Sequence, residues 1–207
     1  MEALGGTHPG PAEVSAAAHA AAELVVDAGR ATDDPELVAR LVALVDDLGL
    51  DTLATLWSQR PARTLPGALW RLYVLREWVR RQPAEASREY TAGMTHAPVS
   101  HAIAGPADPV TPDEVRDLAD RILRGVFDGD LAVALERAAS FARVVSTGRA
   151  ASEPAVDLSP HPAPDAAPSP HDDGHEGDRS ARSAAHLLTM AEDLEAAATL
   201  WRDGRLT

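Results

Sequence analysis

A run of eight residues near the end of the chain holds the densest set of possible metal ligands in the sequence. Residues 171–178 read His-Asp-Asp-Gly-His-Glu-Gly-Asp. Imidazole and carboxylate groups of this kind can bind a divalent metal ion. The run lies inside a proline-rich acidic stretch that offers no further ligand at a fixed position. We therefore interpret it as a solvated acidic tract and predict no metal site.

A cluster of arginines and aromatic residues is the second group with possible chemistry. Residues 60–88 contain seven arginines against two glutamates, a net charge of +5 in a chain whose net charge is −13. Arginines interleaved with aromatic rings are typical of surfaces that stack bases and neutralise phosphates. The alternative is structural, with the aromatic rings in the core and the arginines paired to the acidic residues 1–59. The candidate partner-binding residues are Arg71, Arg76, Trp78, Arg80, Arg81 and Arg88.

Arg76 differs from the other candidates in its position on the expected helix. At 100° per residue it falls inside the apolar stripe formed by Leu65, Leu69, Leu72 and Val79. A charge in such a stripe must be paired, or must face a groove that is left open for a partner. The pattern favours a structural ion pair and leaves the open groove as the alternative.

The patterns that would indicate catalysis are missing from the sequence. The absence of cysteine excludes thiolate metal sites and cysteine nucleophiles. His96 and His101 are five residues apart, whereas helical zinc pairs are four apart with a glutamate between them. There is no phosphate-binding glycine loop and no Gly-x-Ser-x-Gly elbow. We predict no catalytic residue and no cofactor, and an active site assembled from distant parts of the chain stays open.

The composition predicts a soluble, cytoplasmic protein with a core of small side chains. Of the 207 residues, 45% are hydrophobic but only 4% are aromatic. The first residues lack the basic and then apolar pattern of a signal peptide. No apolar run approaches the roughly 18 residues that a membrane span needs. The acidic net charge also disfavours long-range attraction to nucleic acid or anionic membranes.

Helical periodicity predicts an all-α fold, an irregular helical bundle over residues 11–148. Asp34 followed by Pro35 indicates the start of a helix over residues 35–48. Residues 65–82 are apolar nearly all round, which is typical of a helix buried on several sides. We therefore predict that this segment is the central hydrophobic helix of the bundle.

A helical hairpin is predicted at the end of this bundle, over residues 113–147. Thr111, Pro112 and Glu114 form the strongest helix-start signal in the chain. Two apolar stripes follow on either side of a short turn, so the two helices should pack antiparallel. Gly148 is expected to end the second helix.

The segments outside the bundle are predicted from composition. We expect a disordered N-terminus over residues 1–10 and a disordered acidic Pro/Ala-rich linker over residues 149–180. Residues 181–207 contain a terminal amphipathic helix. Its stripe consists of Leu187, Ala191, Leu194, Ala198 and Trp201. The tether keeps this helix near the bundle, so we predict that it docks there; a displaceable lid over the partner groove is the alternative.

Two stretches of the chain resemble segments of known proteins. They are LPGALWRLY at residues 65–73 and GVFDGDLAVALE at residues 125–136. Both are similar to segments of small, all-helical actinobacterial proteins of uncharacterised function. The resemblance covers about residues 35–148 and the final helix. It implies a helical fold and assigns no catalytic residue.

These observations predict a non-enzymatic helical module that binds another protein or regulates it. The alternative is a nucleic-acid-associated accessory protein that uses residues 60–88. An enzyme with a non-local active site is the third hypothesis. Neither a metal nor a membrane partner is expected.

Overall fold

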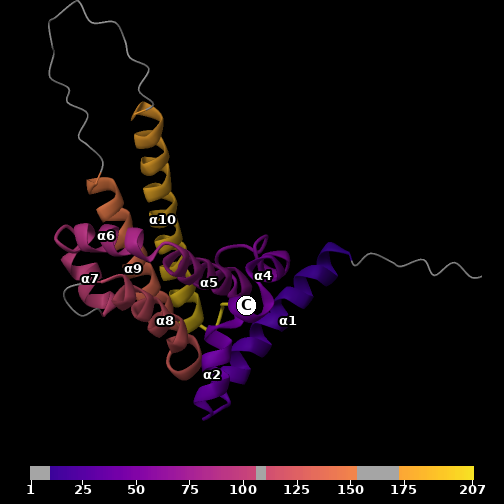
Figure 1. Ribbon diagram of the computed structural model, residues 1–207. Coiled ribbons are helices and arrows are strands. Elements are labelled where there is room, and N and C mark those ends of the chain that lie inside the picture. Colours follow the sequence, from indigo (N-terminus) through magenta and orange to yellow (C-terminus); the bar gives the residue numbers. More distant parts are fainter. Residues whose placement is uncertain (1–9, 106–110, 153–172) are drawn as a thin grey trace, which may run out of the picture.

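The chain folds into an all-α bundle, which confirms the predicted fold class. A computed structural model describes residues 10–105, 111–152 and 173–207, and within these ranges it has helices and no strand (Figure 1). The helices are α1 (Pro11–Arg30), α2 (Pro35–Val42), α3 (Leu44–Leu48), α4 (Leu50–Trp57), α5 (Leu65–Arg81), α6 (Pro83–Met94), α7 (Pro98–Ala104), α8 (Pro112–Asp128), α9 (Leu131–Ala151) and α10 (Asp173–Arg202). Almost all of the predicted disordered N-terminus and most of the predicted linker lie outside the described residues.

Local capping residues account for where several helices begin. The side chain of Asp34 accepts a hydrogen bond from the amide of Glu36 at the start of α2. At the start of α8, the amide of Glu114 donates to the Thr111 hydroxyl (3.3 Å), and the amide of Thr111 donates back to the Glu114 carboxylate (2.7 Å). This reciprocal pair satisfies amides that the first helical turn leaves without a partner. Both starts agree with the sequence prediction.

The predicted single helix over residues 35–48 is wrong, because the chain divides there into α2 and α3. The buried hydroxyl of Tyr73 donates to the carbonyl of Leu41 (2.7 Å), which gives the last turn of α2 a partner outside the helix. Burial raises the pKa of the Tyr73 hydroxyl well above its usual range, so it stays a donor. A hydrogen bond from α5 therefore lies next to the break between α2 and α3, and the local sequence pattern does not predict this break.

The expected end of α9 at Gly148 is also wrong. The helix continues to Ala151, so residues 149–151 belong to the bundle and not to the linker. A Cβ atom at position 148 would lie 1.7 Å from the carbonyl oxygen of Glu89 on α6. Glycine occurs here because two helix backbones touch, not because the helix stops. At the other side of the predicted linker, α10 begins already at Asp173.

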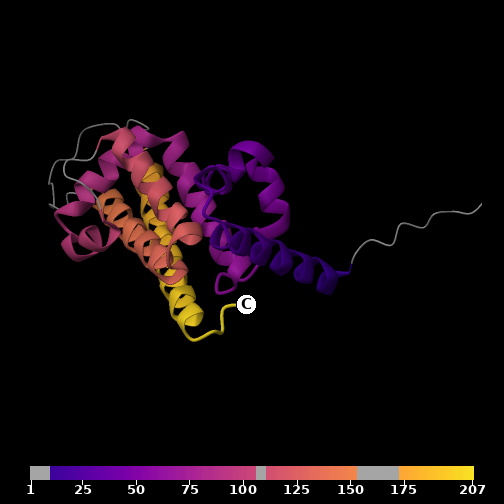
Figure 2. The same ribbon diagram turned by 90° about the horizontal axis from the view of Figure 1, so that it is seen from below.

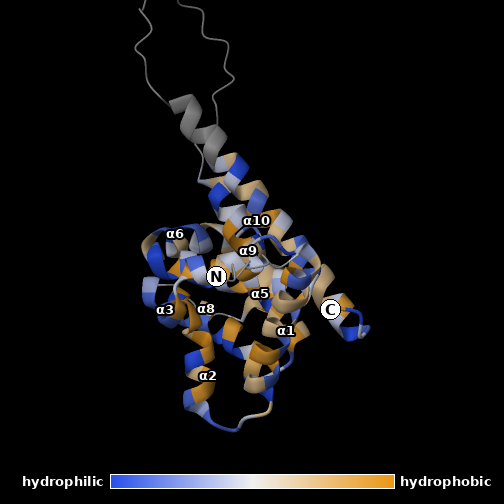
Figure 3. Ribbon diagram, turned by 90° about the vertical axis from the view of Figure 1, so that its right-hand side faces the viewer, coloured by the Kyte–Doolittle hydropathy of each residue, from blue (hydrophilic) through white to orange (hydrophobic). Residues whose placement is uncertain are grey.

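The core is shared between α5 and α9, and α9 is the more deeply buried of the two. It packs against α6, α7, α8 and α10, whereas α5 packs against α1, α4, α8 and α10. The predicted hairpin corresponds to α8 and α9, which contact each other after the turn at Asp128. Helices α1, α5 and α8 contact one another, and each carries hydrophobic residues beside hydrophilic ones (Figure 3). The predicted central helix α5 keeps one half-exposed side, at Trp70, Val74 and Trp78.

The terminal helix α10 packs along α9, and the two lie side by side in both ribbon views (Figures 1 and 2). Its stripe is buried at Leu187, Ala191, Leu194 and Ala198. The chain end is also attached, because the amide of Leu65 donates to the carbonyl of Thr207 (2.9 Å). These contacts make α10 a structural part of the bundle.

An ion pair between α9 and α10 predicts a pH-dependent contribution to stability. Arg202 Nη2 donates to Glu136 Oε2 (2.8 Å), and this hydrogen bond holds the pKa of Glu136 below its usual range. A carboxyl whose pKa is lowered by folding stabilises the protein above its unfolded pKa, and the effect is lost as the pH falls through the folded pKa. We expect Glu136→Gln to lower the Tm by about 1–2 °C at pH 7, and we expect this difference to shrink as the pH is lowered from 7 toward 2. Thermal unfolding of both proteins across this range tests it, and a difference that does not change with pH would contradict it.

Candidate partner-binding groove

The six candidate residues do not form one surface. Five of them lie on α5 and Arg88 lies on α6. Arg80, Arg81 and Arg88 are exposed, whereas Arg71 and Trp78 are half-buried and Arg76 is buried. The sequence places them in one cluster, but the turns of α5 point them in different directions.

Arg76 is buried in an ion pair and is not available to a partner. Its side chain is 3% exposed, and its Nε donates to Asp120 Oδ1 on α8 at 2.6 Å. Its Nη2 lies 3.6 Å from Asp46 on α3. Among the described residues its Nη1 has no hydrogen-bond partner. The structure therefore agrees with the structural ion pair and not with the open groove that the sequence leaves as its alternative for this residue.

The exposed arginines of α5 also face carboxylates. Arg80 Nη2 lies 3.3 Å from Asp46, and Arg81 Nε donates to Glu77 at 2.6 Å. Arg88 is exposed and has no ion pair within the described part of the chain. Much of the positive charge of residues 60–88 is thus matched by acids from other helices or from α5 itself.

A groove runs between the half-exposed side of α5 and the adjacent side of α10. It consists of two adjacent hollows of about 240 and 220 Å³ that share part of their lining. Val74, His186 and Met190 line both hollows; Trp70 lines the first and Trp78 the second. The two tryptophans are eight residues apart on one helix, which corresponds to about 12 Å along its axis. The groove therefore offers two aromatic walls, two helical turns apart, with apolar side chains between them.

The Trp70 end of this groove carries two arginines that share one carboxylate. Arg71 Nη2 lies 3.4 Å from Asp193 on α10, and Arg63 Nε lies 3.7 Å from the same carboxylate. Arg71 also donates to the carbonyl of Gly67 (3.0 Å), which holds its side chain along α5. The three charged side chains together leave one positive charge without a matching carboxylate.

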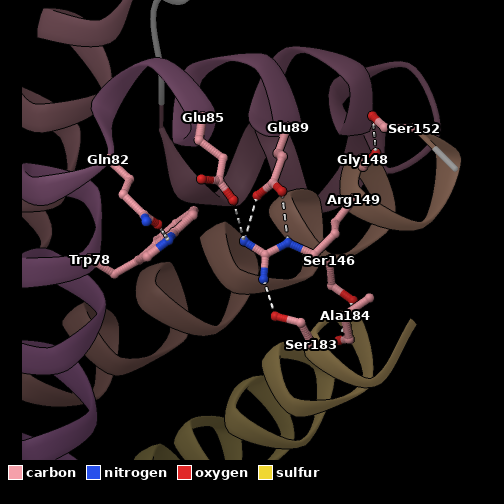
Figure 4. A network of polar contacts seen from close by, with 10 residues as sticks. All are labelled: Trp78, Gln82, Glu85, Glu89, Ser146, Gly148, Arg149, Ser152, Ser183 and Ala184. Carbon is pink, nitrogen blue, oxygen red and sulfur yellow. Dashed lines mark hydrogen bonds and ion pairs between the residues drawn. The ribbon is translucent and has the colours of Figure 1, made fainter. Parts of the chain in front are cut away.

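The Trp78 end of the groove is held by a partly buried polar network around Arg149 (Figure 4). Arg149 Nε and Nη2 each donate to the carboxylate of Glu89 on α6 at 2.7 Å, and Glu85 lies 3.7 Å away. Arg149 Nη1 donates to the hydroxyl of Ser183 on α10. The guanidinium lies 5.3 Å from the centre of the Trp78 ring. One side chain of α9 therefore connects α6, α10 and the aromatic wall of the groove.

Two further hydrogen bonds fix this end of the groove. The indole N–H of Trp78 donates to the side-chain oxygen of Gln82 (2.9 Å). The hydroxyl of Ser146 donates to the carbonyl of Ala184 on α10 (2.8 Å). Both contacts are drawn in Figure 4 and keep the ring and the α10 wall in one arrangement.

Sequence reasoning missed Arg149, because it placed this residue in the linker. A usable signal is present, since Arg149 lies four residues after Val145 and so continues the apolar stripe of α9. Like Arg76, it is an arginine on an apolar stripe with carboxylates at hand. Its hydrogen-bond partners, Glu89 on α6 and Ser183 on α10, lie far from it in the sequence. No local pattern therefore indicates them.

A larger hollow of about 460 Å³ lies between the α1–α2 turn and the α8–α9 turn. Its charged lining residues include Arg30 at the end of α1, Asp33 in the turn and Asp128 at the end of α8, and all three are exposed. Water screens such charges strongly, and the hollow has little apolar lining to drive binding. We therefore take the groove between α5 and α10 as the candidate site.

The remaining candidates for chemistry are the histidines and the acidic side chains of the described residues. Among these residues, no group of three or more histidine, aspartate or glutamate side chains could hold a metal ion. His101 Nδ1 lies 3.2 Å from the Tyr90 hydroxyl, a contact between α7 and α6. The side chains of residues 171–178 are outside the described part of the structure. No described helix combines the length and the hydropathy that crossing a membrane requires.

Comparisons with known proteins found no relative of this chain. No protein-family model, no curated protein and no solved structure matches the chain. The resemblance of residues 65–73 and 125–136 to actinobacterial proteins therefore stays a prediction.

Proposed function

We propose that this chain is a cytoplasmic, non-enzymatic helical module that binds another protein in the groove between α5 and α10. The observation that carries the proposal is the pair of half-exposed tryptophans, Trp70 and Trp78, which line two adjacent hollows on either side of Met190. Large aromatic side chains and methionine are enriched at protein interfaces, and tryptophan often contributes most of the binding energy. A core position would bury both rings, and here neither is buried.

The rigidity of the groove walls supports the same function. Trp78 is held by Gln82 and by the guanidinium of Arg149, and the α10 wall is held by Ser146. A preformed surface loses little conformational entropy on binding, so more of the contact energy is available as affinity. Because α10 forms one wall of this groove, we do not propose it as a displaceable lid.

A nucleic-acid ligand, the alternative that the sequence raises, has less support from the geometry. Phosphate binding needs arginines whose charge is free to replace counterions. Arg71, Arg76, Arg80 and Arg81 already contact carboxylates. We therefore favour a protein partner.

The test compares captured proteins across matched variants of the full chain. Val74→Glu introduces a charge at the middle of the groove, and Leu24→Glu introduces the same charge on α1, where the side chain is 70% exposed. The tagged proteins are incubated with extract of the native host, with and without nuclease treatment, at low and high salt. We expect the wild type and Leu24→Glu to capture the same protein in similar amounts. Val74→Glu should capture at least about tenfold less of it.

Circular dichroism shows whether each variant is folded, and Met190→Glu replaces Val74→Glu if that protein does not fold. The proposal is overturned if folded groove variants capture the same proteins as the wild type. It is also overturned if nuclease treatment abolishes all capture, because the ligand would then be nucleic acid.

A further inference from the structure

We propose that the occupant of the groove is an amphipathic helix of the partner protein, with two large apolar side chains about two turns apart and a carboxylate placed to meet Arg63 and Arg71. This inference rests on the proposed function and names the chemistry of the partner. The acidic side chain of the partner helix lies at the Trp70 end of the groove and not at the Trp78 end.

The spacing of the aromatic walls fits a helix that lies along α5. Trp70 and Trp78 are separated by about 12 Å along α5. A helix that lies along α5 presents side chains at i and i+7 or i+8 over the same distance, whereas an extended strand covers it in about four residues. Helices that bind in apolar grooves use such i, i+3/i+4 and i+7 anchors. Each of the two adjacent hollows can then receive one anchor side chain.

The charges along the groove favour an acidic residue at one end. At the Trp70 end, Arg63 and Arg71 share Asp193, so one positive charge is left without a carboxylate. The Arg63 side chain is 63% exposed, which leaves its guanidinium accessible to a partner. At the opposite end Arg149 is matched by two glutamates, Glu89 and Glu85. A partner carboxylate is therefore attracted to the Trp70 end and repelled from the Trp78 end.

The hydrogen-bonding groups at the Trp70 end agree with an acceptor on the partner. The indole N–H of Trp78 is occupied by Gln82, whereas that of Trp70 has no hydrogen-bond partner within the described part of the chain. Arg71 uses only part of its five donors on Gly67 and Asp193. A carboxylate here would satisfy donors that the protein leaves open.

The experiment uses three synthetic helical peptides and the full chain. The first carries leucines at i, i+4 and i+7 with a glutamate at one end of this apolar face; the second has lysine in place of the glutamate; the third has serines in place of the leucines. Binding is measured by calorimetry and by tryptophan fluorescence at about 0.15 M salt. We expect the lysine peptide to bind about tenfold more weakly than the glutamate peptide, and the serine peptide not to bind.

Charge-reversal variants locate the contact. Arg63→Glu, or Arg71→Glu, should remove the preference for the glutamate peptide or reverse it. Arg40→Glu on α2 is the matched control, because Arg40 is exposed and has no ion pair within the described residues, and it should leave the preference unchanged. Arg63→Glu is the main test, because the Arg63 side chain is 63% exposed and its replacement should not disturb folding.

The outcomes separate this inference from the proposed function. Equal binding of the glutamate and lysine peptides, sensitive to Val74→Glu, would overturn the acidic partner and leave the groove as a protein-binding site. Peptide binding that Val74→Glu does not affect would overturn both. Concentration-dependent dimerisation of the chain that Val74→Glu abolishes would identify a second copy as the occupant and overturn the helix proposed here.

Discussion

We expect Gly148→Ala to destabilise the protein by at least about 3 kcal/mol, or to prevent folding. A Cβ atom at this position on α9 would lie 1.7 Å from the carbonyl oxygen of Glu89 on α6. The opposite glycine has the same constraint, since a Cβ atom at Gly93 would lie 1.9 Å from the carbonyl oxygen of Val144. Both obstacles are backbone atoms, so they cannot move to another rotamer and the two helices would have to separate. Urea unfolding of the variant measures the loss.

Gly125→Ala is the matched control for this prediction. Gly125 lies in α8, and a Cβ atom there would meet only the Cβ of Ala134, at an ordinary contact distance of 3.5 Å. Replacing a helical glycine with alanine where space allows raises stability by about 0.4–1 kcal/mol. If Gly148→Ala behaves like Gly125→Ala, the close crossing of α6 and α9 is absent.

We expect an asymmetric result when the two sides of the buried ion pair are removed in turn. Asp120→Ala leaves the guanidinium of Arg76 buried, with Asp46 at 3.6 Å and an Nη1 atom that has no hydrogen-bond partner among the described residues. A buried charge that loses its partner costs about 3–5 kcal/mol. Arg76→Met removes the buried charge, and the remaining carboxylates of Asp46 and Asp120 are 37% and 35% exposed, so water solvates them. The loss should then be about 1 kcal/mol or less.

Thermal and urea unfolding of both variants checks this asymmetry. Asp47→Ala on α3 is the control, because Asp47 is exposed and has no ion pair within the described residues, and it should change stability by less than about 0.5 kcal/mol. Equal losses for Asp120→Ala and Arg76→Met would mean that the attraction in the pair, and not the burial of the charge, determines its contribution.

Some features of the groove can be predicted from the sequence. The sequence locates an arginine- and tryptophan-rich helix at residues 65–82 and indicates that Arg76 is either paired or open to a groove. It does not show that α10 supplies His186 and Met190 to the opposite wall, because these residues follow α5 by more than 100 positions and have no spacing that relates them to it. The role of Arg149 is hidden for the same reason, since its partner Glu89 lies 60 residues away.

Local features follow from the amino-acid sequence alone: the helical character of the chain, the starts of α2 and α8, and the apolar faces of the helices. Caps and periodicity act over three or four residues, so they can be read directly. The packing of the helices determines whether a glycine ends a helix or lies at a helix crossing, as Gly148 does, and which arginines are neutralised. Those outcomes depend on backbone atoms and carboxylates from other helices, because the Coulomb and packing energies follow distance in space and not distance along the chain.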